Sequence, residues 1–325
     1  MANLRNIHRL TALWALSEAG IGGILHSLQI PFSGFFLAAF AIIMIRLIAF
    51  FSENIFRSVI KATILVLMIK AAASPQSPVT AYLAVAFQGV VGAVVFGAIK
   101  NQNISSYITS ILCLLQTALQ KLIVLLVIFG ASFFKSLDVF ISDVFSNLGF
   151  ERQSFGFWIV GSYLMIYLLW AIYIGYICAI LPAQILSRQE KFGNLNFDNQ
   201  TEPNINQHKI KPFFRNIIFL VFVLAGMYIL ALTFDSKTMM NSFYRALIVI
   251  LLWSILSPLI KKGVLWVLNK NKGVYSRDFS SIFLMLPKLK SKIKPAYVMA
   301  KSESKGIFVY KYFVFNIIAL SLYHE

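Results

Sequence analysis

The stretch WALSEAGIGGILHSLQIPFSG, residues 14–34, places ionisable side chains inside a long apolar segment and so decides the kind of protein this is. Glu18 is the one of twelve acidic residues that falls well inside an apolar run, and His26 follows eight positions later. On an ideal helix the two residues are roughly 80° apart around the axis and about 12 Å apart along it. Because an ionisable group at bilayer depth is costly, both are predicted to serve a functional site.

A stripe of small residues runs beside these polar positions. Ala15, Ala19 and Gly23 recur every four residues. Such stripes let another helix approach closely in lipid. The segment therefore offers one polar face and one docking face.

The composition indicates an all-α, polytopic membrane helix bundle. Hydrophobic residues make up 59% of the 325 residues and charged residues 13%, which is more apolar surface than a soluble domain can bury. The net charge of +17 favours a membrane protein over a nucleic-acid-binding protein, because Lys and Arg gather at the ends of apolar segments and in one long loop. The two cysteines lie in apolar runs and imply neither a disulfide nor a metal site.

The apolar runs divide the chain into four parts. Six runs fall within residues 1–186, at about 8–28, 33–52, 56–73, 79–99, 104–130 and 156–186. Residues 187–212 are polar and read as a cytoplasmic linker. Residues 213–268 hold two further runs, at about 213–234 and 243–268, and predict a transmembrane hairpin. Residues 269–325 form a basic cytoplasmic tail, in which the run at 307–323 either spans the membrane or lies along the inner leaflet.

The charges between the runs predict the orientation. The first run lacks a cleavage site and reads as a retained span, not a signal peptide. Basic residues favour a cytoplasmic N-terminus and cytoplasmic even-numbered connections, so we expect a multi-pass protein of the cell inner membrane. Residues 261–305 hold ten Lys and one Arg against two acidic residues, a pattern typical of contact with anionic lipid. RNA binding is the less favoured alternative, since no aromatic platform accompanies the charge.

Polar side chains also lie inside other predicted spans. Gln116 and Gln120 share a face of the fifth span, with Lys121 beside them, and we expect Lys121 to pair with Glu18. Gln88 lies in the fourth span. The predicted substrate-binding residues are Glu18, His26, Gln88, Gln116, Gln120 and Lys121. Neutral hydrogen-bonding groups with few charges suit a small polar or heteroaromatic molecule. Glutamines can also hold helices together by hydrogen bonds between them.

The chain carries no sequence signature of an enzyme. We find no phosphate-binding G-x-x-x-x-G-K-[ST] loop, no H-E-x-x-H motif and no G-x-S-x-G motif. Spans two to six hold no acidic residue in their interiors, so no metal ligands, catalytic residues or cofactors are expected.

Three features resemble one transporter family. They are the glycine-rich first segment, the L-x-I-P-F-S-G link into the second, and the stretch SP…AYLAVAFQGVVGAVVFG that opens the fourth. Residues 8–186 resemble the substrate-binding S-components of energy-coupling factor vitamin transporters, or an uncharacterised bacterial membrane family similar to them. The resemblance implies a six-helix bundle that binds a vitamin near its outer face and is energised by a transmembrane coupling protein and two ATPases in trans. It assigns docking to Ala15, Ala19 and Gly23; residues 187–325 depart from the family pattern.

The predicted function is therefore uptake of a vitamin-like solute. The alternative is a non-transporting membrane scaffold or assembly factor, whose polar residues only hold helices together and whose basic tail recruits a partner. An intramembrane enzyme acting on lipid is the third and least favoured interpretation.

Overall fold

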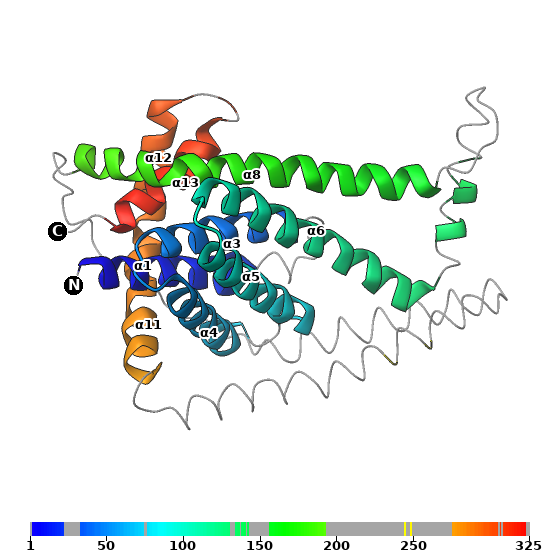
Figure 1. The fold of residues 1–325 in the computed structure, drawn as a ribbon, viewed down its shortest axis with the longest axis horizontal. Helices are drawn as coiled ribbons and strands as arrows, with labels where there is room; N and C mark the ends of the chain where they lie inside the picture. Colours follow the sequence, from blue (N-terminus) through cyan, green and yellow to red (C-terminus); the bar gives the residue numbers. More distant parts are fainter. Residues whose placement is uncertain are drawn as a thin grey trace. The chain divides into compact units, whose positions relative to one another are not determined.

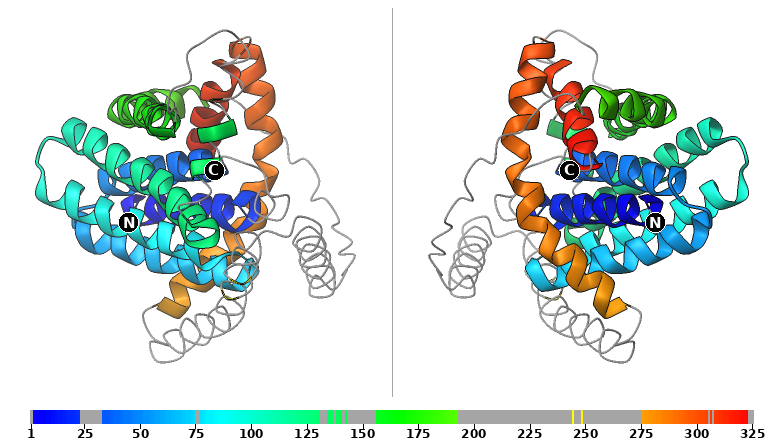
Figure 2. Two further views of the ribbon diagram at one scale, coloured as in Figure 1. Left: turned by 90° about the vertical axis from the view of Figure 1, so that its right-hand side faces the viewer. Right: turned by 90° about the vertical axis from the view of Figure 1, so that its left-hand side faces the viewer.

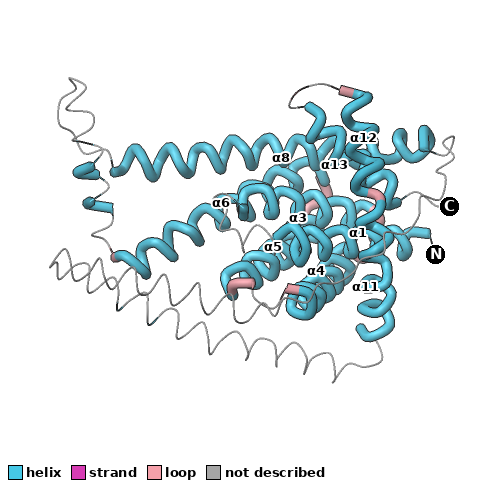
Figure 3. The backbone as a smooth tube through the Cα atoms, turned by 180° about the vertical axis from the view of Figure 1, so that it is seen from behind, coloured by secondary structure: helices cyan, strands magenta, loops and turns pink. Residues whose placement is uncertain are grey.

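The computed structural model describes most of the chain as helix (Figure 1). The described residues are 2–22, 33–74, 77–130, 134–136, 138–140, 142, 156–192, 244, 248, 275–304, 306 and 308–322. Within these ranges every element is helical and none is a strand (Figure 3). The prediction of an all-α chain is confirmed for this part of the protein.

The helices follow the apolar runs closely in the first half of the chain. They are α1 (Ala2–Leu16), the π-helical turn η1 (Ser17–Ile21), α3 (Ser33–Phe50), α4 (Ile55–Ala73), α5 (Val79–Ala98), α6 (Gln102–Phe129) and α8 (Gly156–Phe192). The C-terminal helices are α11 (Tyr275–Ser291), α12 (Ile293–Glu303) and α13 (Phe308–Leu322). The predicted hairpin at 213–268 lies outside the described residues, apart from Tyr244 and Ile248.

Three of the described helices are long and apolar enough to cross a membrane. They cover Val79–Ala98, Gln102–Phe129 and Trp158–Arg188. Shorter apolar helices cover Gly34–Phe50 and Val309–Leu322. The chain is thus a membrane protein by the length and composition of its helices. Helix α13 has 15 residues and a length of about 22 Å, less than the hydrocarbon thickness of about 30 Å.

The chain groups into two compact units. The first comprises Met1–Gln120, Tyr163–Asp198 and Leu256–Glu325, and the second comprises Lys121–Ser162 and Asn199–Ile255. In the second unit, apolar side chains at the end of α6 and the start of α8 are exposed, for example Val127 and Trp158. The predicted domain boundaries stay a prediction, since residues 193–243 and 249–274 lie outside the described part of the chain.

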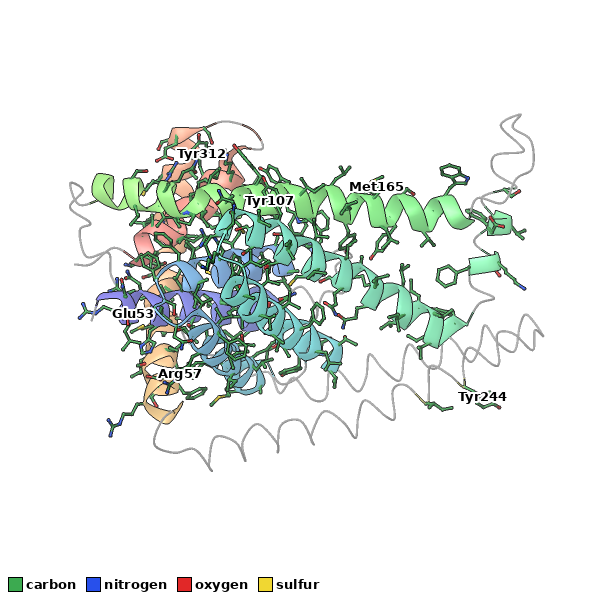
Figure 4. All side chains as sticks on the ribbon, in the orientation of Figure 1. Glu53, Arg57, Tyr107, Met165, Tyr244 and Tyr312 are labelled. Atoms are coloured by element: carbon green, nitrogen blue, oxygen red, sulfur yellow. The ribbon has the colours of Figure 1, made fainter. Side chains whose placement is uncertain are left out.

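Helices α4 and α5 of the first unit form a tightly packed antiparallel pair. A Cβ atom added at Gly89 would lie 2.1 Å from Oγ1 of Thr63, and one added at Gly92 would lie 2.4 Å from Cγ2 of Ile45. The absent side chains therefore let α5 approach both α4 and α3. The same device recurs between α6 and α8, where a Cβ at Gly175 would lie 2.6 Å from Cδ1 of Tyr107 (Figure 4).

The C-terminal helices belong to the first unit and pack beside its N-terminal helix (Figure 2). Helix α1 contacts α11 and α13, and α12 contacts α13. Arg9 of α1 donates a hydrogen bond to the carbonyl of Ser321 at 3.2 Å. Asp278 of α11 forms an ion pair with Lys61 of α4 and lies 3.5 Å from Nε2 of His8. The two ends of the sequence thus share one core.

Candidate functional site: a polar and aromatic layer

A buried ion pair joins the end of the first helical segment to α4. Oε2 of Glu18 accepts a hydrogen bond from Nζ of Lys70 at 2.6 Å. Glu18 is 3% exposed and Lys70 is 0% exposed. Burying two charges is costly, and removal of one partner leaves the other charged and unpaired. Each charge of this pair therefore depends on the other.

The local backbone of Glu18 departs from regular α-helix. Residues Ser17–Ile21 form a single π-helical turn, a feature often found at functional sites. The hydroxyl of Ser17 donates to the carbonyl of Trp14 at 2.8 Å. Glu18 lies in the first turn of this segment, and Lys70 lies in the last turn of α4, where the helix dipole favours a cation.

The sequence predicted a different partner for Glu18. The predicted Glu18–Lys121 pair is wrong, because the carboxylate pairs with Lys70. Lys70 was missed because it stands at the edge of an apolar run, where a lysine is expected to extend toward the headgroups. The useful signal was its position in ILVLMIKAAASP, where six apolar residues precede it and three alanines follow it.

The start of α5 covers Lys70. The ring centroid of Tyr82 lies 5.8 Å from Nζ of Lys70, a favourable cation–π distance. The hydroxyl of Tyr82 donates to the carbonyl of Ser74 at 3.3 Å. The hydroxyl oxygens of Ser74 and Ser77 are 2.9 Å apart. Ser74 at the end of α4 is therefore hydrogen-bonded to residues at and just before the start of α5, next to the ion pair.

The two predicted glutamines of α6 reach the same turn of α5. Nε2 of Gln120 donates to the carbonyl of Thr80 at 2.7 Å, and Nε2 of Gln116 donates to Oε1 of Gln120 at 3.1 Å. The buried Oε1 of Gln116 has no hydrogen-bond partner in the described part of the chain. A buried acceptor without a partner is energetically costly, so a ligand that donates a hydrogen bond to it gains binding free energy.

Aromatic side chains of α3 and α8 continue this arrangement. The rings of Phe35 and Trp170 stack with centroids 4.7 Å apart, and the indole of Trp170 donates to the carbonyl of Phe35 at 3.3 Å. Phe35 also meets Tyr167 edge to face at 5.2 Å. Tyr167 is 0% exposed, so it is part of the core.

Contacts of α6 link the aromatic group to the glutamines. The Cγ2 atom of Thr117 lies 2.9 Å from the position of a Cβ at Gly34, beside Phe35. The hydroxyl of Tyr163 is 3.5 Å from the carbonyl of Ala118. We call this connected set the polar–aromatic layer; it comprises Glu18, Phe35, Lys70, Tyr82, Gln116, Gln120, Tyr167 and Trp170.

Gln88 lies apart from this layer along α5. It is eight residues beyond Thr80, a rise of about 12 Å. Its side chain is 2% exposed, and its buried Oε1 has no hydrogen-bond partner among the described residues. Gln88 and the glutamines of α6 thus occupy different depths of the bundle.

The remaining predicted site residues are placed only in part. Ala15 is 0% exposed inside the core and Ala19 is half-buried, whereas Gly23 and His26 lie outside the described residues. Lys121 follows Gln120 on α6 and is half-buried. Docking by Ala15 would need α1 to separate from its neighbours in this chain. In the described residues, no group of three His, Cys, Asp or Glu side chains is arranged to hold a metal.

Comparisons of the chain with protein-family models, with curated proteins and with solved structures find no match.

Proposed function

We propose that this chain is a solute-uptake component of the cell inner membrane. The helices of residues 1–186 would bind a small polar or heteroaromatic molecule, and separate proteins, a transmembrane coupling protein and ATPases, would supply the energy. The N-terminus would lie in the cytoplasm, and the basic C-terminal part would contact anionic lipid. The polar–aromatic layer is the observation that supports this proposal.

The layer has the chemistry that such a ligand needs. Each of the helical segments η1, α3, α4, α5, α6 and α8 contributes a side chain to it. Stacked aromatic rings bind flat heterocycles, and amide groups such as that of Gln116 fix their orientation. On the predicted topology the start of α5 faces the outside, which is the side from which a solute would arrive.

The Glu18–Lys70 pair has a specific role in this proposal. A neutral, internally paired charge set does not repel an uncharged ligand, yet each member can still hydrogen-bond to it. His26, Gln88 and Lys121 remain proposed as further polar contacts, and Ala19 with Gly23 as the docking face for the coupling protein.

The experiment is a ligand screen by thermal unfolding of the purified full chain. Vitamins and nucleobase-like solutes are added singly, and a true ligand at a hundred times its dissociation constant is expected to stabilise the protein by about 2.7 kcal/mol. Gln116→Ala should abolish that gain. The matched control is Gln102→Ala, a glutamine at the opposite end of the same helix, which should retain it.

The scaffold alternative gives a different result. For a scaffold we expect that no solute stabilises the protein and that Gln116→Ala and Gln102→Ala respond to solutes in the same way. We also expect the basic C-terminal part to capture a defined partner. That combination would overturn the uptake proposal.

A further inference from the structure

Arg46 is a buried cation that the polar–aromatic layer does not use. It lies four residues before the end of α3, and its side chain is 5% exposed. Its Nε and Nη1 atoms are buried and have no hydrogen-bond partner in the described part of the chain. Glu18, Asp278 and Glu303 form ion pairs with other side chains, and none of these pairs includes Arg46. The sequence predicts an arginine that extends to the headgroups; here it is enclosed between helices.

Two aromatic rings flank the guanidinium. Its Cζ atom lies 5.9 Å from the ring centroid of Phe50 and 5.7 Å from that of Phe96. Cation–π attraction to two rings is much weaker than the cost of removing an ion from water. The rings therefore position Arg46 without neutralising its charge. Binding of an anion would compensate that charge.

The position of Arg46 favours a lipid as the source of that anion. Arg46 is about 6 Å from the last residue of α3 along the helix axis, and Phe96 lies in the last turn of α5. Phe50 is 42% exposed at the same helix end. On the predicted topology this end faces the cytoplasmic leaflet, which carries anionic headgroups.

We propose that Arg46 binds the phosphate group of an anionic phospholipid between the ends of α3 and α5. A planar guanidinium matches phosphate oxygens well, and its buried Nε and Nη1 atoms are donors that no described residue satisfies. The acyl chains would lie against the exposed apolar side chains of the same helices. This site is separate from the polar–aromatic layer and from the basic C-terminal segment.

The test uses the full chain, delipidated in neutral detergent, and native mass spectrometry with three probes. They are phosphatidylglycerol, phosphatidylcholine and inorganic phosphate. Wild type should retain one phosphatidylglycerol at collision energies that remove the others, and Arg46→Met should weaken its binding at least tenfold. Arg57→Met, at an exposed arginine of the same end of the bundle, is the matched control and should change binding less than twofold.

Several results would overturn the proposal. They are a wild type that retains no phosphatidylglycerol, an Arg46→Met variant that binds it as wild type does, and equal retention of phosphatidylcholine. Displacement of the lipid by millimolar inorganic phosphate would assign the site to a soluble phosphate instead.

Thermal unfolding provides a second, independent readout. Without lipid, Arg46→Met should unfold at a higher temperature than wild type, because it removes an unpaired buried charge. With phosphatidylglycerol, wild type should gain stability and the variant should not. A lower unfolding temperature of Arg46→Met in the absence of lipid would show that Arg46 is satisfied by the protein, and the proposal would fail.

Discussion

At the scale of single residues, the Glu18–Lys70 pair carries an electrostatic cost, because both charges are buried. Both side chains are almost fully buried, so each charge depends on the other for its stabilisation. A buried pair of this kind adds little net stability compared with apolar side chains of the same volume, yet breaking it is expensive. Its presence is therefore better explained by a requirement for polarity at this depth than by stability.

We predict that Glu18→Gln destabilises the protein by about 3–5 kcal/mol, because it leaves the Lys70 ammonium buried without a counter-charge. Lys70→Met should cost a similar amount. The double variant should recover most of the loss, and unfolding in detergent for the four proteins of this cycle measures it. Glu53→Gln, at an exposed carboxylate, is the control and should change stability by no more than about 0.5 kcal/mol. Additive losses in the double variant would contradict the pairing.

A second residue-scale prediction concerns the α4–α5 contact. Gly89→Ala places a methyl group against the side chain of Thr63 and should cost about 1–3 kcal/mol through displaced helices. Gly161→Ala in α8 has nothing within 4 Å of the added Cβ and should be neutral or slightly stabilising. The same unfolding measurement compares the two variants, and equal effects would show that the close approach is not required.

At the scale of elements, α11 is held to α1 and α4 by one acidic side chain. Asp278 is 18% exposed and faces both Lys61 and His8. Asp278→Asn should weaken the docking of α11 by about 1 kcal/mol, because the contact is partly screened by water. Hydrogen exchange of the amides of α11 should accelerate correspondingly. Arg277→Gln, at the exposed neighbouring position, should leave the exchange unchanged.

The periodicity of the sequence predicted the described elements of the first half well. Apolar runs determined the helices, and the four-residue spacing correctly put Gln116 and Gln120 on one face, where they are hydrogen-bonded. Partners between elements were not predictable, because helical spacing says nothing about which helix faces which. Lys70 shows this: it stands near the end of an apolar helix, where a lysine often meets the headgroups, and only the packing around α4 places it inside.

At the scale of the whole molecule, the two native cysteines make the topology testable. Cys113 and Cys178 are both 0% exposed, so the wild-type protein should react with maleimide only after unfolding. Arg57→Cys and Lys135→Cys introduce thiols at exposed positions on opposite predicted faces. In intact cells an impermeant maleimide should label Lys135→Cys, and it should label Arg57→Cys only after lysis. Labelling of both in intact cells would contradict the predicted orientation.

The shared core of the chain's two ends has a consequence for biosynthesis. Helix α1 is synthesised before α11 and α13, two of the helices that cover it. Until α13 has been synthesised, the flank of α1 that α11 and α13 cover lacks these contacts, and lipid or the insertion machinery must cover it. A message broken before codon 275 would therefore yield a product with an uncovered first helix, a natural target for membrane quality-control proteases.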